Sequence, residues 1–276
     1  MFTRIKDLFD VGALADAEVL IVGCGSGGSS VALKLAMSGV HKFTLVDPDA
    51  LGIENVIRHV CGRRYVGHLK VDAVADVLRD RNPEVEVERV ASDITNYEAA
   101  SSLVERAATV VLATDNEASR YFVNQVCVET ATAFTVGRVF TRGIGGEVFA
   151  YRPGAGGCLA CLEAVLQRTK FREGIREVDL VSEDEREKVY AMTISEIKDS
   201  PGLAVDIDFI TSFHTRFTLD ALFSALNYRP TALPPIPENY VVWGNRPVHP
   251  FDKHFQLQRI NLPAQDQCRV CKVKAA

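Results

Sequence analysis

Residues 17–46 read AEVLIVGCGSGGSSVALKLAMSGVHKFTLV, and the acidic DPD of residues 47–49 follows directly. An apolar run ends at Gly23, further glycines stand at Gly25 and Gly28, and a helical pattern then leads into a second apolar run. Short apolar runs bounded by turn residues are typical of buried strands. The order therefore predicts a strand, a glycine turn, a helix and a second strand.

The predicted turn and the acid that follows it point to a nucleotide. Glycines permit a tight turn and a close approach of the backbone to a polyphosphate, and the first turn of the helix offers free N–H groups to it. Asp47 closes the second apolar run, where an acid about 20 residues after the glycines can bind a ribose hydroxyl. Dehydrogenases, methyltransferases and adenylating enzymes all use this pattern, so by itself it leaves the reaction open.

The composition limits the class of protein. The chain has 276 residues, of which 47% are hydrophobic, and this suffices for the core of one large α/β domain or two small ones. The net charge of -5 gives no broad attraction to nucleic acid or to anionic lipid, so we expect neither nucleic acid nor a membrane as a partner. No apolar run reaches the roughly 18 residues that span a bilayer, and residues 1–12 lack the apolar core of a signal peptide. We therefore expect a cytoplasmic protein.

Helix and strand patterns alternate through the first half of the chain. Residues 1–10 carry apolar side chains at helical spacing and predict a short amphipathic helix. The elements expected after the glycine turn are, in chain order, an irregular loop over 51–67, a helix over 70–81, a strand over 85–90, a helix over 96–107, a buried strand over 109–114 and a helix over 117–130. This alternation predicts a Rossmann-like, doubly wound, mainly parallel α/β sheet, with its ligand at the carboxyl ends of the strands, where Asp47 and Asp115 fall.

The second half of the chain has a different pattern. Residues 133–140 and 146–153 predict two strands joined by glycines, which indicates an antiparallel C-terminal extension of the sheet. Residues 172–200 are rich in charged side chains and predict a crossover loop. The remaining expected elements are a long helix over 205–226 and strands over 240–243 and 255–260.

Four of the seven cysteines form two CxxC pairs, Cys158 with Cys161 and Cys268 with Cys271. The cytosol keeps thiols reduced, so metal ligands or free thiols are expected rather than disulfides. Four thiolates in two such pairs are typical of a closed tetrahedral Zn2+ site, which would be structural because no coordination position stays open. The alternatives are two unrelated pairs of reduced cysteines or a redox pair; the sequence shows no helix start behind either pair that would favour redox chemistry.

Several spaced motifs together resemble one enzyme family. They are, in order, GCGSGG at 23–28, VDPD at 46–49, ENVIRH at 54–59, VGHLK at 66–70, RNPEV at 81–85, TDNEASR at 114–120 and the paired CxxC motifs. The chain resembles, over nearly its whole length, the adenylyltransferases that activate ubiquitin and its bacterial relatives, including the ThiF, MoeB and HesA types. The resemblance implies one ThiF-type adenylation domain over 1–276, with a nucleotide-binding half over 1–132 and a substrate-binding and zinc half over 133–276.

The resemblance also implies roles for single residues. Asp47 matches the acid that binds the ribose of ATP, and Asn55, Arg58 and Lys70 match the residues that bind the triphosphate. Asp115 matches the acid that binds Mg2+. These charges suit the reaction, because attack of a carboxylate on the α-phosphate brings two anions together and requires cations to neutralise them.

Other matched positions concern the assembly and the neighbourhood of the site. Arg4 matches an arginine that reaches into the ATP site of the neighbouring subunit, which implies a homodimer. Arg120 and Asn124 fall where the helix after the metal-binding acid keeps polar residues. His59 stands where the family more often has glutamine.

Each assignment has a simpler alternative. Arg4 could form a surface ion pair, Asp115 could cap the following helix, and Arg63 and Arg64 could belong to a solvated basic loop. The residues expected to have only packing or structural roles are Cys24, Cys61, Cys127 and His214.

The implied reaction is Mg2+-dependent adenylation, by ATP, of the C-terminal glycine of a ubiquitin-like or sulfur-carrier protein. The activated end would then pass to a conjugating enzyme, a sulfur donor or an amine. No cysteine lies between Cys161 and Cys268, so a thioester formed on the crossover loop is not predicted. Two alternatives stay open: an NAD-dependent Rossmann oxidoreductase, and a non-catalytic subunit that docks a ubiquitin-like protein.

Overall fold

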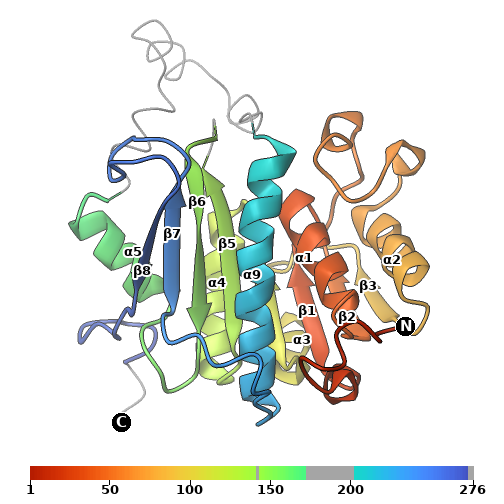
Figure 1. Ribbon diagram of the computed structural model, residues 1–276, viewed down its shortest axis with the longest axis horizontal. Coiled ribbons are helices and arrows are strands. Elements are labelled where there is room, and N and C mark those ends of the chain that lie inside the picture. Colours follow the sequence, from red (N-terminus) through yellow and green to blue (C-terminus); the bar gives the residue numbers. More distant parts are fainter. Residues whose placement is uncertain (141–142, 172–201, 273–276) are drawn as a thin grey trace, which may run out of the picture.

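The protein is built on one eight-stranded sheet, seen in a computed structural model that describes residues 1–140, 143–171 and 202–272 (Figure 1). The strand order is β3-β2-β1-β4-β5-β6-β7-β8. The strands are β1 (Glu18–Val22), β2 (Lys42–Val46), β3 (Glu86–Val90), β4 (Thr109–Leu112), β5 (Phe134–Phe140), β6 (Gly145–Tyr151), β7 (Tyr240–Gly244) and β8 (Gln256–Ile260). The first five strands of this order, β3, β2, β1, β4 and β5, pair in parallel. From β5 on, each strand pairs antiparallel with the next, through β6 and β7 to β8. The predicted parallel sheet with an antiparallel extension is confirmed.

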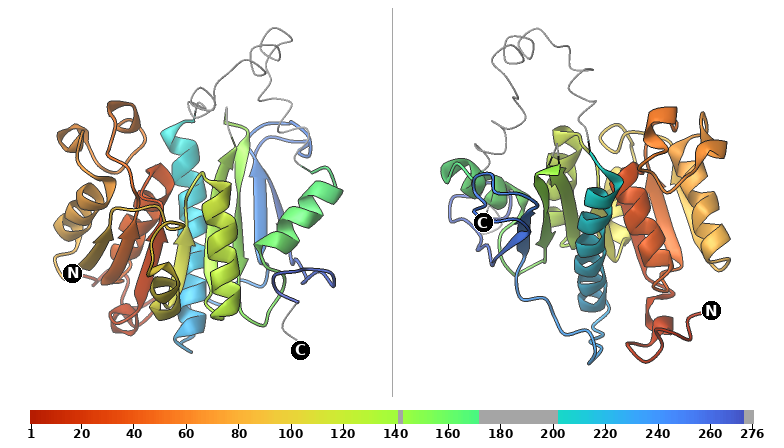
Figure 2. Two further views of the ribbon diagram at one scale, coloured as in Figure 1. Left: turned by 180° about the vertical axis from the view of Figure 1, so that it is seen from behind. Right: turned by 45° about the horizontal axis from the view of Figure 1, so that its top comes forward.

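Helices cover both faces of the sheet (Figures 1 and 2). One face carries α1 (Ser26–Ala36), α2 (Lys70–Arg81) and the long α9 (Ala204–Ala225); the other carries α3 (Ala100–Arg106), α4 (Glu117–Glu129) and α5 (Leu159–Arg168). Each layer encloses its own large cluster of buried apolar side chains. Strands β1 and β4 lie between the layers, which is why their sequences are continuous apolar runs rather than alternating ones.

Two glycines, at the end of β1 and in the first turn of α1, position the start of this helix. Gly23 has a φ of +93°, and a Cβ there would lie 2.8 Å from the carbonyl carbon of Ala113 at the end of β4. A Cβ on Gly28 would lie 1.8 Å from the carbonyl oxygen of Gly23. Glycine at both positions therefore lets α1 start directly above the junction of β1 and β4, where the order of connections reverses and doubly wound sheets bind ligands.

Three boundaries differ from expectation. Residues 1–10 form turns instead of a helix, and Asp10 then caps a short 3-10 helix (Val11–Leu14) by accepting from the Gly12 N–H at 3.0 Å. The helix expected from residue 96 begins only at Ala100, after Asp93 accepts from the Thr95 backbone N–H at 2.8 Å in a local turn. The buried strand expected to residue 114 ends at Leu112. The predicted crossover loop over 172–200 lies outside the described residues.

Among the residues that the structure describes, no helix combines the length and the apolar character that a membrane crossing requires.

Candidate active site

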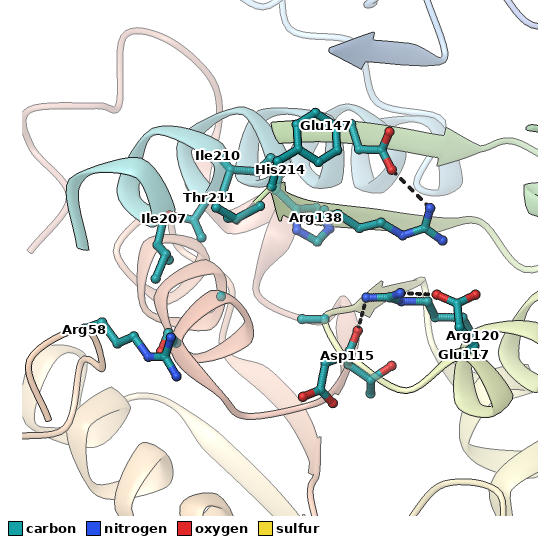
Figure 3. A pocket seen from close by; sticks show the side chains of 17 residues that line it. Arg58, Asp115, Glu117, Arg120, Arg138, Glu147, Ile207, Ile210, Thr211 and His214 are labelled. Carbon is teal, nitrogen blue, oxygen red and sulfur yellow. Dashed lines mark hydrogen bonds and ion pairs between the residues drawn. The ribbon is translucent and has the colours of Figure 1, made fainter. Parts of the chain in front are cut away.

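A cleft of about 450 Å³ opens at the carboxyl end of the parallel strands (Figure 3). Six parts of the chain line it: the start of α1, the loop after β2, the segment from β4 into α4, strand β5, strand β6 and one face of α9. Its charged lining side chains are Arg58, Asp115, Glu117, Arg120, Arg138 and Glu147. In Figure 3 the side chains of α9 and β5 face Arg58 and Asp115 across the cleft.

The start of α1 is open towards the cleft. Gly25 is the N-cap residue and provides no side-chain cap, and Ser26 and Gly27 line the cleft. A Cβ built on Gly25 or on Gly27 would meet nothing within 4 Å, in contrast to Gly23 and Gly28. The N–H groups of the first helical turn therefore face free space, which suits the binding of a phosphate.

Asp47 is buried beside this turn. Its Oδ2 accepts from the Cys24 N–H at 2.7 Å and its Oδ1 from the Asp49 N–H at 2.9 Å. Lys70 Nζ lies 3.8 Å from Asp47 Oδ1 and 2.8 Å from Asp49 Oδ2. Burial raises the pKa of Asp47, while Lys70 and the two N–H groups oppose that shift. For Lys70, burial acts to lower the pKa, but the bond to Asp49 and the charges of Asp47 and Asp115 outweigh it and raise the pKa overall. Asp47 and Lys70 thus form one fixed charge pair next to the glycine turn.

The loop after β2 brings Arg58 into the cleft. Asn55 caps its own short 3-10 helix (Ile53–Asn55) by accepting from the Gly52 N–H at 3.1 Å. The Nε of Arg58 has no partner among the described residues. Arg63 and Arg64 are exposed, as expected for a solvated loop, and Arg64 stacks over the Tyr65 ring.

His59 ties this loop to the glycine turn. The Cys61 N–H donates to His59 Nδ1 at 3.0 Å, so the proton is on Nε2, which donates to the Cys24 carbonyl at 2.8 Å. Burial lowers the pKa of His59, in keeping with a neutral ring. His59 therefore has a structural role, which its place in the sequence beside Arg58 did not predict.

Asp115 is exposed and lines the cleft at the start of α4. The cap of α4 is Asn116, whose side chain accepts from the Ala118 N–H at 2.8 Å. The alternative that Asp115 caps this helix is therefore wrong, and its carboxylate stays available to a ligand. Arg120 donates to the Thr114 carbonyl at 2.6 Å and pairs with Glu117, which fixes the loop that presents Asp115.

Sequence reasoning missed the polar side of β5 and β6. Arg138 donates to Glu147 at 3.0 Å and to Glu163 of α5 at 2.5 Å, and the Tyr240 hydroxyl donates to Glu147 at 2.6 Å. Burial acts to lower the pKa of Arg138, but the two carboxylates outweigh it and raise the pKa. The only sequence signal was a charged residue within each of two otherwise apolar strands, because such residues rarely face a core unless they are paired.

The structure separates the residues predicted for the nucleotide-binding half. Arg58, Asp115 and Arg120 lie in the cleft, whereas the adjoining turn and its supports are formed by Gly23, Gly25, Gly28, Asp47, Asn55 and Lys70. Asn124 is fully buried, away from the cleft, and accepts from the Leu159 N–H at 2.9 Å.

Arg4 lies apart from the cleft of its own chain. Its segment lies at the amino ends of the parallel strands, where Phe9 packs against Phe223 and the Asp10 N–H donates to the Tyr228 hydroxyl at 2.7 Å. Arg4 is exposed there and forms no ion pair with the described residues. A role in a neighbouring subunit stays a prediction.

The four predicted metal ligands meet on the other side of the sheet extension. All four Sγ atoms lie within 4.8 Å of one another, with Cys158 to Cys268 at 3.7 Å and Cys161 to Cys271 at 3.5 Å. A tetrahedral Zn2+ with bonds of about 2.3 Å places its sulfur ligands about 3.8 Å apart, whereas a disulfide bond is about 2.05 Å long. The thiol set therefore fits a structural zinc ion.

Cys158 is the N-cap residue of α5, so a helix does start behind the first pair, contrary to expectation. What disfavours a redox pair is the second pair of thiols, which lies against the first. Cys24, Cys61 and Cys127 are buried, as expected.

Comparisons with known proteins match most of this chain to one protein family. The model of the ThiF family matches residues 5–226. "Adenylyltransferase and sulfurtransferase MOCS3" from Sus scrofa is 36% identical over 150 residues, which are 54% of this chain and 32% of that protein. "Ubiquitin-like modifier-activating enzyme 5" from Caenorhabditis briggsae is 29% identical over 188 residues, 62% of this chain and 44% of that protein. These alignments span about a third to under half of the relatives' length.

Solved structures of low sequence identity share the fold. MccB of E. coli, solved with ATP, superposes with a TM-score of 0.68 over 95% of this chain and 68% of that chain, at 20% identity. The complex of MccB with N-formylated MccA gives the same TM-score, 0.68.

Proposed function

The chain belongs to the ThiF family, and from this premise we propose that it uses ATP to adenylate the C-terminal glycine of a ubiquitin-like or sulfur-carrier protein. A carboxylate oxygen of the protein substrate attacks the α-phosphorus of ATP, the bond to the bridging oxygen breaks, and pyrophosphate leaves. The observation that carries the proposal is that one cleft joins the open start of α1 to Arg58 and to the free carboxylate of Asp115. Phosphate-binding, cationic and metal-binding groups in one cleft suit chemistry at the phosphates of a nucleoside triphosphate.

Each group has a task in this proposal. The N–H groups at the start of α1 bind phosphate oxygens, and Asp47 accepts a ribose hydroxyl. Arg58 and Lys70 neutralise the charge of the triphosphate. Asn55 Oδ1 accepts from Gly52, whereas its amide NH2 has no acceptor among the described residues and donates to the triphosphate. Asp115 would hold Mg2+, which supplies charge neutralisation at the phosphates when bound.

The acyl-adenylate is proposed as the product that leaves the site. Cys24, Cys61 and Cys127 are buried, and burial raises the pKa of each thiol, that of Cys61 to about 12. None of these three is suited to attack an acyl-adenylate. The acceptor is then a conjugating enzyme, a sulfur donor or an amine.

The assembly is part of the same proposal. A homodimer would place Arg4 of one subunit at the ATP site of the other, in the cytoplasm, where ATP is available. The chain would act as a single adenylation domain over 1–276, and the thiolates of Cys158, Cys161, Cys268 and Cys271 would hold one structural zinc.

ATP–pyrophosphate exchange tests the proposal directly. Purified protein is incubated with candidate ubiquitin-like proteins that end in glycine and with versions lacking the tail. Exchange should require the tail and should be abolished in Asp115→Ala, while Asp115→Ala keeps its melting temperature because the carboxylate is exposed. Arg63→Ala is the matched control, since it removes an exposed charge outside the cleft. Nucleotide binding without exchange for any tail would favour the docking subunit, and a melting temperature raised by NAD and not by ATP would favour the oxidoreductase.

A further inference from the structure

His214 lies in the wall of the cleft and is not explained by nucleotide binding. It projects from α9 next to β5, is 2% exposed, and lines the cleft together with Gly137 (Figure 3). A Cβ built on Gly137 would lie 2.7 Å from His214 Nδ1, so only a glycine at 137 lets the ring pack this closely against β5.

A buried chain of hydrogen bonds fixes the position of the ring proton. The Thr218 hydroxyl donates its hydrogen to the His214 carbonyl at 2.9 Å, so it accepts from the Thr135 hydroxyl, also at 2.9 Å. The hydrogen of Thr135 is thereby used, and Thr135 Oγ1 must accept from His214 Nε2–H at 3.0 Å. The proton is therefore on Nε2 and the lone pair is on Nδ1.

The lone pair on Nδ1 has no donor among the described residues. Burial lowers the pKa of His214 to about 4, so the ring stays neutral near pH 7 and Nδ1 remains an acceptor. An acceptor that is held in one orientation in a binding cleft, without a donor, selects for a ligand that brings an N–H or O–H group.

The chemistry of the opposite wall indicates which group of the ligand donates to His214 Nδ1. Arg58 and the start of α1 attract the phosphates and the carboxylate, whereas a lone pair repels them, so the anionic end of a tail lies away from His214. A peptide tail offers its backbone N–H groups as donors immediately before that end. Ile207 and Ile210 form an apolar wall beside His214, which suits an unbranched backbone.

We propose that His214 is a specificity-determining residue whose Nδ1 accepts a backbone N–H of the substrate tail, directly before the carboxylate that is adenylated. This inference rests on the proposed function and extends it, because it requires an amide N–H within the last residues of the tail. A tail in which that nitrogen is replaced by an ester oxygen is then bound weakly, although its shape is nearly unchanged.

The test uses stable mimics of the acyl-adenylate, so the natural substrate need not be known. The probes are sulfamoyladenosine, acetyl-Gly-Gly-sulfamoyladenosine, and two analogues in which one of the two amide N–H groups is replaced by an ester oxygen. Dissociation constants are measured by calorimetry for the wild type, His214→Gln and His214→Asn. Glutamine can keep the Nε-type donor to Thr135 but carries no acceptor at the Nδ1 position, whereas asparagine can place its Oδ1 there.

We expect one ester analogue to bind the wild type about tenfold more weakly than the amide. In His214→Gln the amide probe should bind about three- to tenfold more weakly, and the difference between amide and ester should fall to about twofold or less. His214→Asn should keep most of the discrimination, and sulfamoyladenosine should bind all three proteins alike.

Two results would count against the inference in different ways. If the wild type binds both ester analogues as tightly as the amide, or if His214→Gln retains the discrimination, Nδ1 accepts water and the inference is wrong while adenylation stands. If the wild type binds neither sulfamoyladenosine nor its acylated form, the proposed function is wrong, and the inference that rests on it is wrong as well.

Discussion

Replacing Arg138 by methionine should destabilise the protein more than any exposed ion-pair substitution. The side chain of Arg138 is 10% exposed and its guanidinium contacts Glu147 and Glu163, whose side chains are 3% and 20% exposed. Methionine keeps much of the apolar stem but leaves the two carboxylates without this cation. Breaking a buried pair by removing one partner costs about 3 to 5 kcal/mol, so the free energy of unfolding should fall by about 3 kcal/mol or more.

The assay is urea unfolding, with thermal unfolding as a second measure. For a chain of this size each kcal/mol corresponds to about 2 to 4 °C, so the melting temperature should fall by about 6 to 12 °C. Arg89→Met is the matched control: Arg89 pairs with Asp72 at 2.9 Å, but the two side chains are 48% and 42% exposed, and the loss there should stay below about 1 kcal/mol.

The double variant Arg138→Met/Glu147→Gln separates charge from packing. If the loss comes from a buried carboxylate that no longer has the Arg138 cation, glutamine at 147 should recover a large part of it, because a neutral amide costs less to bury than a carboxylate. Equal losses in Arg138→Met and Arg89→Met, or no recovery in the double variant, would refute the reasoning that the polar side of β5 is a buried charge cluster.

Three further predictions follow from single positions. Elemental analysis should find one zinc per chain. Cys268→Ser should lose the zinc and have a lower melting temperature, and removing zinc from the wild type with a chelator should also lower the melting temperature. Gly28→Ala should destabilise the fold by several kcal/mol, because its Cβ would overlap the Gly23 carbonyl. Gly25→Ala should fold normally and weaken ATP binding, since its Cβ points into the open space of the cleft. His214 binds a proton less readily in the folded chain than in the unfolded chain. The free energy of unfolding should therefore fall by about 3 kcal/mol in total as the pH drops from about 6.5 to 4. In His214→Gln, the free energy of unfolding should depend less steeply on pH over this range.

Periodicity predicted most elements because most of them obey a single physical rule. The runs that became β1 and β4 are buried on both faces and are therefore continuously apolar, and Lys70 and Asn82 bound a helix at the positions where the pattern starts and stops. The first ten residues did not follow the rule. Ile5 and Phe9 do pack against the core, but ten residues form too few helical hydrogen bonds to offset the cost of starting a helix, and the segment forms turns.

The candidate site was predictable only where its residues are close in sequence to a motif. Asp47 and Asp115 follow buried strands, so topology alone places both at the carboxyl edge. Arg138 of β5 pairs with Glu147 of β6, and His214 of α9 bonds to Thr135 of β5, so each depends on the packing of separate elements. Neither the proton position of His214 nor the pairing of Arg138 has a local sequence signature, because both are set by hydrogen bonds that cross more than one element.

Helix α5 connects the thiol cluster to the cleft. Its N-cap is Cys158, and Cys161 follows one turn later, so a bound metal ion would hold the first turn of the helix. Glu163 stands two residues after Cys161 and contacts Arg138 in the cleft at 2.5 Å. A structural metal on the far side of the sheet extension would thus fix the carboxylate that orients a cleft cation, so loss of zinc should disturb the cleft through Arg138 as well as lower the stability of the fold.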